Sequence, residues 1–260
     1  MFNGRVLIVE NTSLAPNYYR MTVSAPEIAT LAKPGQFIQF RVAGNDSNDP
    51  LLPRPISIYQ IKTLSGNISV IYKVVGRGTE ILAAKKAGEL LEVIGPIGNG
   101  FSIPTGIEKM ALIAGGVGMP PLFCLAESLK KEYLNLELTL FYGGRSGRDI
   151  LEWDNWTKIG VEIHTATEDG TLGTRGLVTG LFLEEHRQAG FQYLVACGPQ
   201  PMLQAVQKIA IAENIPGLLS LEANMACGVG ACLGCTCSTT KGYRRVCVDG
   251  PVFDLKEVVW

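Results

Sequence analysis

Four of the chain's seven cysteines fall within residues 227–237, and a fifth follows at Cys247. Three of them, Cys227, Cys232 and Cys235, have the spacing C-x4-C-x2-C. The chain begins without the charged and apolar segments of an export signal, so we expect a cytoplasmic protein, in which disulfides are rare. Clustered cysteines in that setting are typical of metal ligands or redox groups. The fold must therefore wrap a tight loop around three thiols and bring a fourth from a separate segment.

This spacing, with Cys247 as the fourth ligand, is the plant-type pattern for a [2Fe–2S] cluster. A loop around an anionic cluster must turn its backbone N–H groups inward, and small residues permit such turns. The loop has small residues at Gly228, Gly230, Ala231 and Gly234. We expect short strands at 238–240 and 243–246, and their hairpin would return Cys247 to the loop.

A structural zinc site is the alternative explanation of the cysteines. Zinc sites more often use two C-x2-C pairs or some histidine. Here Cys232 and Cys235 form one such pair, and the chain has only two histidines. The side chain of Cys237 would point to the opposite side of a strand, so we expect it to pack. We expect Cys124, in an apolar helix, to belong to the core.

Composition narrows the classes of partner. The chain has 260 residues, a net charge of −1 and no run of Lys or Arg, so we expect neither nucleic acid nor a membrane as a partner. The uncharged apolar run 110–126 is broken by glycines and prolines. It is typical of a buried strand, a turn and a helix start rather than of a membrane span.

Up to about residue 101, short β-branched and aromatic runs are separated by Gly, Pro, Asn and Asp. Many short strands with one helix indicate an antiparallel barrel. We expect strands at 5–10, 19–24, 36–42, 56–59, 67–75 and 90–94, and a helix at 79–87.

From about residue 109 the pattern changes to strands that alternate with helices, which indicates a parallel doubly wound sheet. We expect strands at 109–114, 137–142, 161–166 and 193–197, and helices at 121–130, 177–188 and 201–214. The whole chain then divides into domains at 1–102, 103–215 and 216–260.

Two segments of the first domain are suited to a flavin dinucleotide. The planar guanidinium of Arg54 suits a pyrophosphate, and the Ser57 hydroxyl can reach a flavin ring nitrogen. Gly78 and Thr79 lie at the start of a helix. Exposed N–H groups there, and glycines that let a ligand come close to the backbone, make a phosphate-binding site. Such a turn alone is usually an N-cap. Together, in a β domain that precedes an α/β domain, the two segments favour FAD.

Three strand ends of the second domain predict a nicotinamide nucleotide site. Gly115, Gly116 and Gly118 follow a buried strand and open a helix, although they do not match the strict Gly-x-Gly-x-x-Gly fingerprint. The strand ends at 141–145 and at Cys197–Gly198 add to them, because open α/β sheets bind ligands at the carboxyl ends of their strands. Each turn taken alone can be an ordinary connection between a strand and a helix.

The chain resembles the ferredoxin–NADP⁺ reductase superfamily in four segments, Arg54–Ser57, Gly78–Thr79, Gly115–Gly118 and Cys197–Pro199. The C-terminal cysteine pattern narrows the resemblance to the electron transfer subunits of class 1B dihydroorotate dehydrogenase, over essentially the whole chain. The most specific segments are Leu52–Ile58, Gly95–Phe101 and Ser220–Cys232.

This resemblance implies a multidomain protein with an antiparallel FAD-binding β-barrel, a Rossmann-like NAD-binding parallel sheet and a small C-terminal [2Fe–2S] module. The FAD contacts that it implies are Arg54, Pro55, Ile56, Ser57, Ile71, Tyr72, Lys73, Gly78 and Thr79. Ile56 stands where many superfamily members carry an aromatic residue. The expected nicotinamide contacts are Gly115, Gly116, Gly118, Cys197 and Gly198, and the cluster ligands are Cys227, Cys232, Cys235 and Cys247.

The resemblance further implies a partner, an FMN-containing dihydroorotate dehydrogenase catalytic subunit, in a heterotetramer of two copies of each. Electrons would pass from dihydroorotate through FMN, the cluster and FAD to NAD⁺, in pyrimidine biosynthesis. No catalytic acid or base stands out, and we expect His164 and His186 to be packing or surface residues. The alternatives are the small subunit of an NAD(P)H:ferredoxin transhydrogenase or of a sulfide-dehydrogenase-type complex. The segment Arg145–Arg148 keeps NADP open beside NAD.

Overall fold

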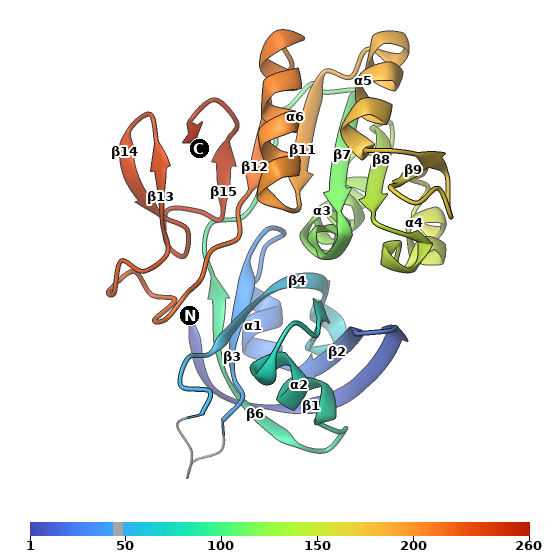
Figure 1. Ribbon diagram of the computed structural model, residues 1–260. Coiled ribbons are helices and arrows are strands. Elements are labelled where there is room, and N and C mark those ends of the chain that lie inside the picture. Colours follow the sequence, from blue (N-terminus) through green and yellow to red (C-terminus); the bar gives the residue numbers. More distant parts are fainter. Residues whose placement is uncertain (44–48) are drawn as a thin grey trace. The chain divides into compact units, whose positions relative to one another are not determined.

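The computed structural model describes residues 1–43 and 49–260 of the chain. The described residues form two compact units (Figure 1). The first unit consists of Met1–Gly100, Glu222–Cys237 and Tyr243–Pro251. The second unit consists of Phe101–Leu221, Ser238–Gly242 and Val252–Trp260.

The first unit is built on a closed antiparallel barrel with the strand order β1-β2-β5-β4-β3-β6. Its strands are β1 (Phe2–Ala15), β2 (Tyr18–Ser24), β3 (Phe37–Arg41), β4 (Arg54–Lys62), β5 (Asn67–Lys73) and β6 (Leu90–Ile97). Val70 pairs with Met21 on one side and with Ile58 on the other, and all three are fully buried. Closure leaves the strands no free edge, which confirms the expected barrel.

Three short helical segments accompany the barrel: α1 (Pro26–Leu31), η1 (Thr63–Ser65) and α2 (Arg77–Ala84). Asn11 holds the C-terminal end of α2, because its Nδ2 donates to the carbonyl oxygens of Leu82 at 3.0 Å and Lys85 at 2.8 Å. The Tyr72 hydroxyl in turn donates to Asn11 Oδ1 at 3.0 Å. Unpaired carbonyls at a helix end thus gain donors, and α2 is fixed against the barrel.

The second unit is a seven-stranded sheet with the order β10-β9-β8-β7-β11-β12-β15. Its strands are β7 (Lys109–Gly115), β8 (Glu137–Gly144), β9 (Glu162–Thr167), β10 (Thr174–Arg175), β11 (Tyr193–Cys197), β12 (Gly217–Ser220) and β15 (Val252–Asp254). All neighbours are parallel except β12 and β15. The direction of winding reverses at β7, which has β8 on one side and β11 on the other, so the sheet is doubly wound as expected.

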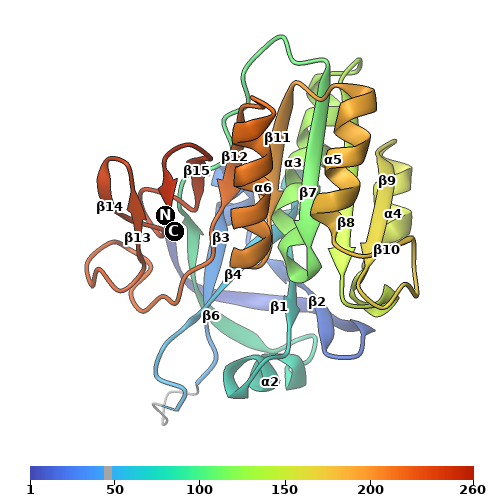
Figure 2. The ribbon, with the colours of Figure 1, turned by 45° about the horizontal axis from the view of Figure 1, so that its top comes forward.

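Helices cover both faces of this sheet (Figure 2). The helices are η2 (Gly116–Gly118), α3 (Met119–Glu132), η3 (Gly147–Asp149), α4 (Trp153–Lys158), α5 (Val178–Ala189) and α6 (Gln200–Ala212). Helices α5 and α6 lie side by side on one face, and α3 and α4 lie on the other. This arrangement follows from right-handed crossovers on either side of β7.

Residues 216–260 are divided between the two compact units, and the expected domain boundary at 215/216 stays a prediction. Strand β12 extends the parallel sheet beside β11, and β15 pairs with β12. A small sheet with the order β14-β13-β16 is made by β14 (Gly242–Arg245), β13 (Thr236–Thr239) and β16 (Val258–Val259). Strands β12 and β15 thus join the larger sheet, whereas β13, β14 and β16 form a sheet of their own.

Candidate functional site

The cysteine loop 227–235 turns its backbone N–H groups toward sulfur. The N–H groups of Val229 and Cys232 each donate to Cys227 Sγ at 3.4 Å. The N–H of Gly234 donates to Cys232 Sγ at 3.4 Å. Positive φ angles at Gly228 (70°), Gly230 (80°) and Leu233 (59°) make these turns. The loop thus has the inward N–H groups that an anionic cluster requires.

Hydrogen bonds join the four expected ligands in two pairs. The N–H of Cys232 donates to Cys227 Sγ, and the N–H of Cys247 donates to Cys235 Sγ, each at 3.4 Å. Within the described residues, no three Cys, His, Asp or Glu side chains gather closely enough to hold a single metal ion. Two pairs of thiols suit a cluster of two irons, because each iron takes two protein ligands. The four residues therefore fit a [2Fe–2S] cluster.

The two pairs differ in exposure, and Cys227 and Cys247 also differ in the pKa of their thiols. Cys235 and Cys247 are buried, at 3% and 1% exposure, whereas Cys232 is exposed and Cys227 half-buried. Burial opposes ionisation of Cys227, but the N–H groups of Cys232 and Val229 outweigh it and lower the pKa of its thiol to about 6. Burial and the neighbouring Cys235 raise the pKa of Cys247 to about 12. The Cys247 thiol would therefore need the positive charge of bound iron to become a thiolate.

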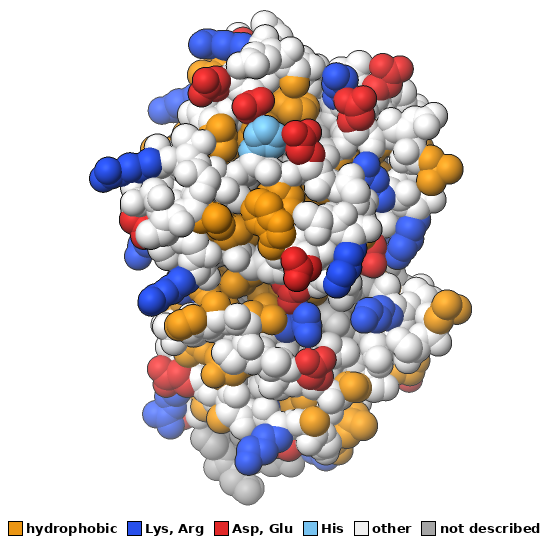
Figure 3. Space-filling model, turned by 90° about the vertical axis from the view of Figure 1, so that its right-hand side faces the viewer, with side chains coloured by type: hydrophobic (Ala, Val, Ile, Leu, Met, Phe, Trp, Pro, Cys, Tyr) orange, Lys and Arg blue, Asp and Glu red, His pale blue; other side chains and the backbone are white. Residues whose placement is uncertain are grey.

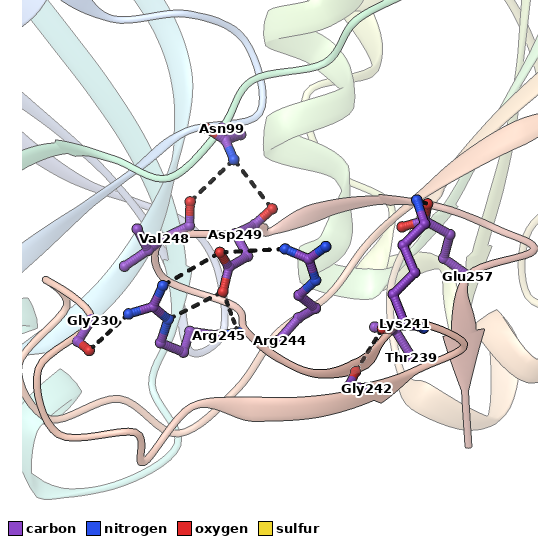
Figure 4. Close-up of polar contacts among 10 residues, drawn as sticks. All are labelled: Asn99, Gly230, Thr239, Lys241, Gly242, Arg244, Arg245, Val248, Asp249 and Glu257. Atoms are coloured by element: carbon purple, nitrogen blue, oxygen red, sulfur yellow. Dashed lines mark hydrogen bonds and ion pairs between the residues drawn. The ribbon is translucent and has the colours of Figure 1, made fainter.

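The segment that carries Cys247 is tied to the cysteine loop by Arg245 and Asp249 (Figure 4). The Nε and backbone N of Arg245 donate to Asp249 Oδ2 at 3.1 and 2.8 Å. Its Nη1 donates to the carbonyl oxygen of Gly230 at 3.2 Å. The bonds from Arg245 hold the pKa of Asp249 below its ordinary value, so this carboxylate stays charged. One arginine thus joins the two segments that supply the four thiols.

Asn99 ties the same segment to the barrel. It follows β6, and its Nδ2 donates to the carbonyl oxygens of Val248 and Asp249, each at 3.1 Å (Figure 4). Its backbone N–H donates to Gly250 O at 2.6 Å. The expected fourth ligand, Cys247, is therefore positioned from the barrel side as well as from the loop. Asn99 lies in the segment Gly95–Phe101, which carries part of the resemblance, but no role was expected for it.

The remaining cysteines lie as follows. Cys124 is buried in α3, and burial raises the pKa of its thiol, as expected for a core residue. Cys237 is half-buried in β13, and burial raises the pKa of its thiol. The packing role assigned to Cys237 stays a prediction.

The structure brings the two expected phosphate-binding features of the barrel together. A Cβ at Gly78 would overlap the guanidinium of Arg54, so this group lies directly over the first turn of α2. Thr79 Oγ1 accepts the N–H groups of Val75 at 2.9 Å and Gly76 at 3.2 Å, and caps the turn. An arginine fork above a helix N-terminus suits a pyrophosphate. The residues present therefore fit FAD, although their individual contacts stay predictions.

The other expected flavin residues lie on adjacent strands. Pro55, Ile56 and Ser57 are on β4, and Ile71, Tyr72 and Lys73 are on β5. Two of the residues on β5, Tyr72 and Lys73, already contact other side chains of the protein. Tyr72 is buried, bonds Asn11 and stacks on Tyr19 with a centroid separation of 5.8 Å, and Lys73 Nζ lies 4.7 Å from the Tyr18 ring centroid.

The expected nicotinamide residues meet at the point where the sheet reverses direction. A Cβ on Gly118 would collide with the Cys197 carbonyl and lie 2.7 Å from Gly198 N. A Cβ on Gly115 would lie 2.7 Å from Met202 Sδ. The turns after β7 and β11 thus touch backbone to backbone, which only glycine permits. This is where open α/β sheets bind nucleotides.

The strand end after β8 carries an acid that the sequence analysis did not single out. Asp149 Oδ2 accepts the backbone N–H groups of Arg145 and Ser146, each at 3.1 Å. The segment Arg145–Arg148, considered for NADP, is therefore shaped around a carboxylate. The sequence indicates this arrangement through Ser146 and Asp149, which form the Ser-x-x-Asp pattern of a capping box.

Two further observations concern the surface. On the face drawn in Figure 3, Lys and Arg side chains are interspersed with Asp and Glu. Within the described residues, no helix is both long and apolar enough to cross a membrane.

Two family models match parts of the chain. The iron–sulfur cluster binding domain of dihydroorotate dehydrogenase B matches residues 222–259, which contain the four paired cysteines. The oxidoreductase NAD-binding domain matches residues 112–208, which contain the turns after β7 and β11.

Among solved structures, the chain is similar to one described under flavin-based electron bifurcation by NADH-dependent reduced ferredoxin–NADP oxidoreductase. The TM-score is 0.88 at 27% identity, and the match covers 98% of this chain and 90% of that one. A ferredoxin reductase in carbazole 1,9a-dioxygenase shares the fold, with a TM-score of 0.68 at 23% identity over 82% of this chain and 66% of that one.

Curated relatives match along the full length. The dihydroorotate dehydrogenase B (NAD(+)) electron transfer subunit of Desulforamulus reducens is 39% identical, covering 100% of this chain and 98% of the relative. The subunit of the same name from Bacillus caldolyticus is 39% identical over 98% of each chain, and that from Clostridium acetobutylicum is 37% identical over 97% and 95%. The paired thiols, the barrel and the reversing sheet all lie within these matches, and the chain belongs to the family of dihydroorotate dehydrogenase B (NAD(+)) electron transfer subunits.

Proposed function

We propose that this chain passes electrons from an FMN-containing dihydroorotate dehydrogenase catalytic subunit to NAD⁺. The observation that carries the proposal is the pairing of four cysteines in the same compact unit as the barrel. When bound, FAD exchanges two electrons with a nicotinamide and single electrons with an iron–sulfur cluster. A chain with these three sites can therefore link a one-electron route to a two-electron acceptor.

The protein's own contribution is to position and to stabilise charge. Cys227, Cys232, Cys235 and Cys247 would hold [2Fe–2S], with loop N–H groups directed at sulfur. Arg54 and the start of α2 would hold the FAD pyrophosphate. The turns at Gly115–Gly118 and Cys197–Gly198 would receive NAD⁺. None of these roles requires a general acid or base.

A catalytic partner is implied by the name of the family, and we propose that it docks over the cysteine loop. Val229 and Leu233 in this loop and Val248 beside Cys247 are exposed. Apolar side chains next to an exposed ligand pair are suited to a protein interface rather than to water. The heterotetramer with two copies of each subunit is part of the proposal, and the mass of the co-purified complex measures it.

We also propose a cytoplasmic location. The seven cysteines all lie in the described residues, and none of them forms a disulfide there. Thiols that serve as ligands persist in a reducing compartment, where disulfides are rare.

A second candidate function is supported by one finding. The TM-score of 0.88 to a NADH-dependent reduced ferredoxin–NADP oxidoreductase favours the small subunit of a transhydrogenase. The sequence identity to that structure is 27%, against 39% to the dihydroorotate dehydrogenase B subunits. We therefore place dihydroorotate first as the electron source.

The test is dihydroorotate-dependent reduction of NAD⁺ by the chain co-expressed and purified anaerobically with an FMN catalytic subunit. We expect turnover only when both subunits are present, with FAD, iron and acid-labile sulfide in the purified chain. Cofactor-loaded protein that binds the partner but reduces no NAD⁺ with dihydroorotate would overturn the assignment of the donor. Protein without iron or sulfide would overturn the electron route itself.

A further inference from the structure

Gln39 is a buried polar residue whose side chain has no hydrogen-bond partner among residues 1–43 and 49–260. It lies in β3, opposite Pro55 of β4 and Ile94 of β6. Its exposure is 1%, and both Nε2 and Oε1 lack partners in that part of the chain. Burying a carboxamide without compensation is unfavourable, and native proteins rarely do so. The position therefore calls for a partner that the polypeptide does not supply.

The Gln39 carboxamide lies against the cysteine loop. A Cβ built on Gly228 would lie 2.6 Å from Gln39 Nε2 and 2.9 Å from its Cδ. Gly228 directly follows the ligand Cys227 and adopts a φ of 70°. The loop thus passes over Gln39 with no side chain between them. Both residues belong to the same compact unit.

A carboxamide offers two N–H donors and one acceptor oxygen. An iron–sulfur cluster held by thiolates is anionic and presents only sulfur acceptors at its surface. The amide end of Gln39 therefore has the complementary chemistry, and it lies beside the residue that follows a ligand. Neighbouring donors and the hydrophobic shell tune such clusters through their sulfur atoms.

We propose that Gln39 is a positioning residue of the cluster, whose Nε2 donates a hydrogen bond to a cluster-face sulfur, either of Cys227 or of inorganic sulfide. This inference rests on the proposed function and adds a residue that the ligand pattern does not contain. Reduction adds negative charge to the cluster, and a fixed N–H donor stabilises that charge. Gln39 thus makes the cluster easier to reduce and orients the loop beneath it.

The first test replaces Gln39 with leucine, which has a similar volume and no donor, in the full chain loaded with its cofactors. We expect unchanged iron content, a cluster midpoint potential shifted to more negative values, and an altered electron paramagnetic resonance spectrum of the reduced cluster. Gln207→Leu is the matched control. Gln207 is also buried, but its Nε2 donates to the carbonyl oxygens of Leu255 at 2.6 Å and Val258 at 2.8 Å. The control should leave the cluster potential unchanged.

The second test needs no variant. Pulsed electron paramagnetic resonance of the reduced wild-type cluster, after ¹⁵N labelling of glutamine side-chain amides, should reveal a coupled amide nitrogen. A fully loaded protein with no such coupling, or a leucine variant with the wild-type potential, overturns the role of Gln39 and leaves the electron route intact. A shift confined to the potential of FAD also overturns it, because the amide then bonds the flavin. Wild-type protein without iron overturns the route and the inference together.

Discussion

The cysteine loop and the turns after β7 and β11, where the nicotinamide nucleotide is expected, are both rich in glycine. Glycine serves a different purpose in each region. In the loop, Gly228 and Gly230 have positive φ angles of 70° and 80°, which direct N–H groups toward sulfur. At the turns, a Cβ on Gly118 or Gly198 would collide with the neighbouring backbone or with Met202. The cysteine loop depends on the direction in which its backbone turns. The turns after β7 and β11 depend instead on how closely two backbone segments approach each other. Substitutions should therefore damage the two regions in different ways.

The largest effect is expected when one of the four expected cysteine ligands is replaced. Cys235→Ser replaces a buried ligand by an oxygen that binds iron poorly, so we expect loss of most iron and sulfide from the purified protein. Metal analysis and visible absorption measure the loss. Cys237→Ser is the control two residues away, and it should keep the cluster. Full loss of iron in that control would show that Cys237 is a ligand, contrary to the expected assignment.

Adding one methyl group at the nicotinamide turns should have the next largest effect. Gly118→Ala places a Cβ against the Cys197 carbonyl, and we expect a destabilisation of about 1–3 kcal/mol together with weaker binding of NADH. Thermal unfolding and the rate of flavin reduction by NADH measure the two effects. Cluster content should not change.

Gly180→Ala is the matched control for that prediction. Gly180 lies in α5, and a Cβ there would meet no atom within 4 Å. Alanine in a helix is favoured over glycine by about 0.5–1 kcal/mol, so this variant should gain stability and keep its reactivity with NADH. Equal losses in both variants would contradict the close-approach argument.

Arg244 and Arg245 both face Asp249, and we expect their replacement to have smaller effects than the substitutions above. The two variants should also differ from each other. Arg245→Ala removes the bonds to Asp249 and Gly230, and we expect faster release of iron to a chelator and a lower stability. Arg244 lies 3.8 Å from Asp249 and is more exposed, so Arg244→Ala should cost about 0–1 kcal/mol. If both variants release iron at the wild-type rate, the proposed tie between the two ligand segments is wrong.

The smallest effect is expected at the end of β8. Asp149→Asn keeps an acceptor for the N–H groups of Arg145 and Ser146 but removes a negative charge near the expected ribose site. We expect the KM for NADPH to fall about fivefold, which corresponds to about 1 kcal/mol, while the KM for NADH stays constant. An equal change for both nucleotides would place Asp149 outside nucleotide selection.

Much of the fold followed from local patterns. Alternating short strands predicted the barrel, and strands that alternate with helices predicted the parallel sheet, with limits that mostly lie within a few residues of those observed. The strand expected at 56–59 runs from Arg54 to Lys62, because Pro55 is tolerated there and the polar residues beyond Tyr59 continue the ladder. The short strand β12 carried too little pattern to be recognised.

The site was predictable where residue type alone carries the chemistry. Four cysteines at fixed spacing require a cluster or a metal whatever surrounds them. Asn99, Arg245 and Asp249 could not be found in this way, because their bonds join segments that are about 150 residues apart or cross an irregular turn. Gln39 looked like an ordinary polar residue of a strand until its surroundings were known. The individual FAD and NAD⁺ contacts remain predictions for the same reason.

The unequal burial of the two cysteine pairs has a consequence for how the protein is maintained. With the proposed ligands, oxygen and chelators would reach the cluster first on the side of Cys227 and Cys232, because Cys235 and Cys247 are buried. We therefore expect a damaged cluster to be lost and rebuilt from its exposed side, while the buried pair of cysteines stays in place.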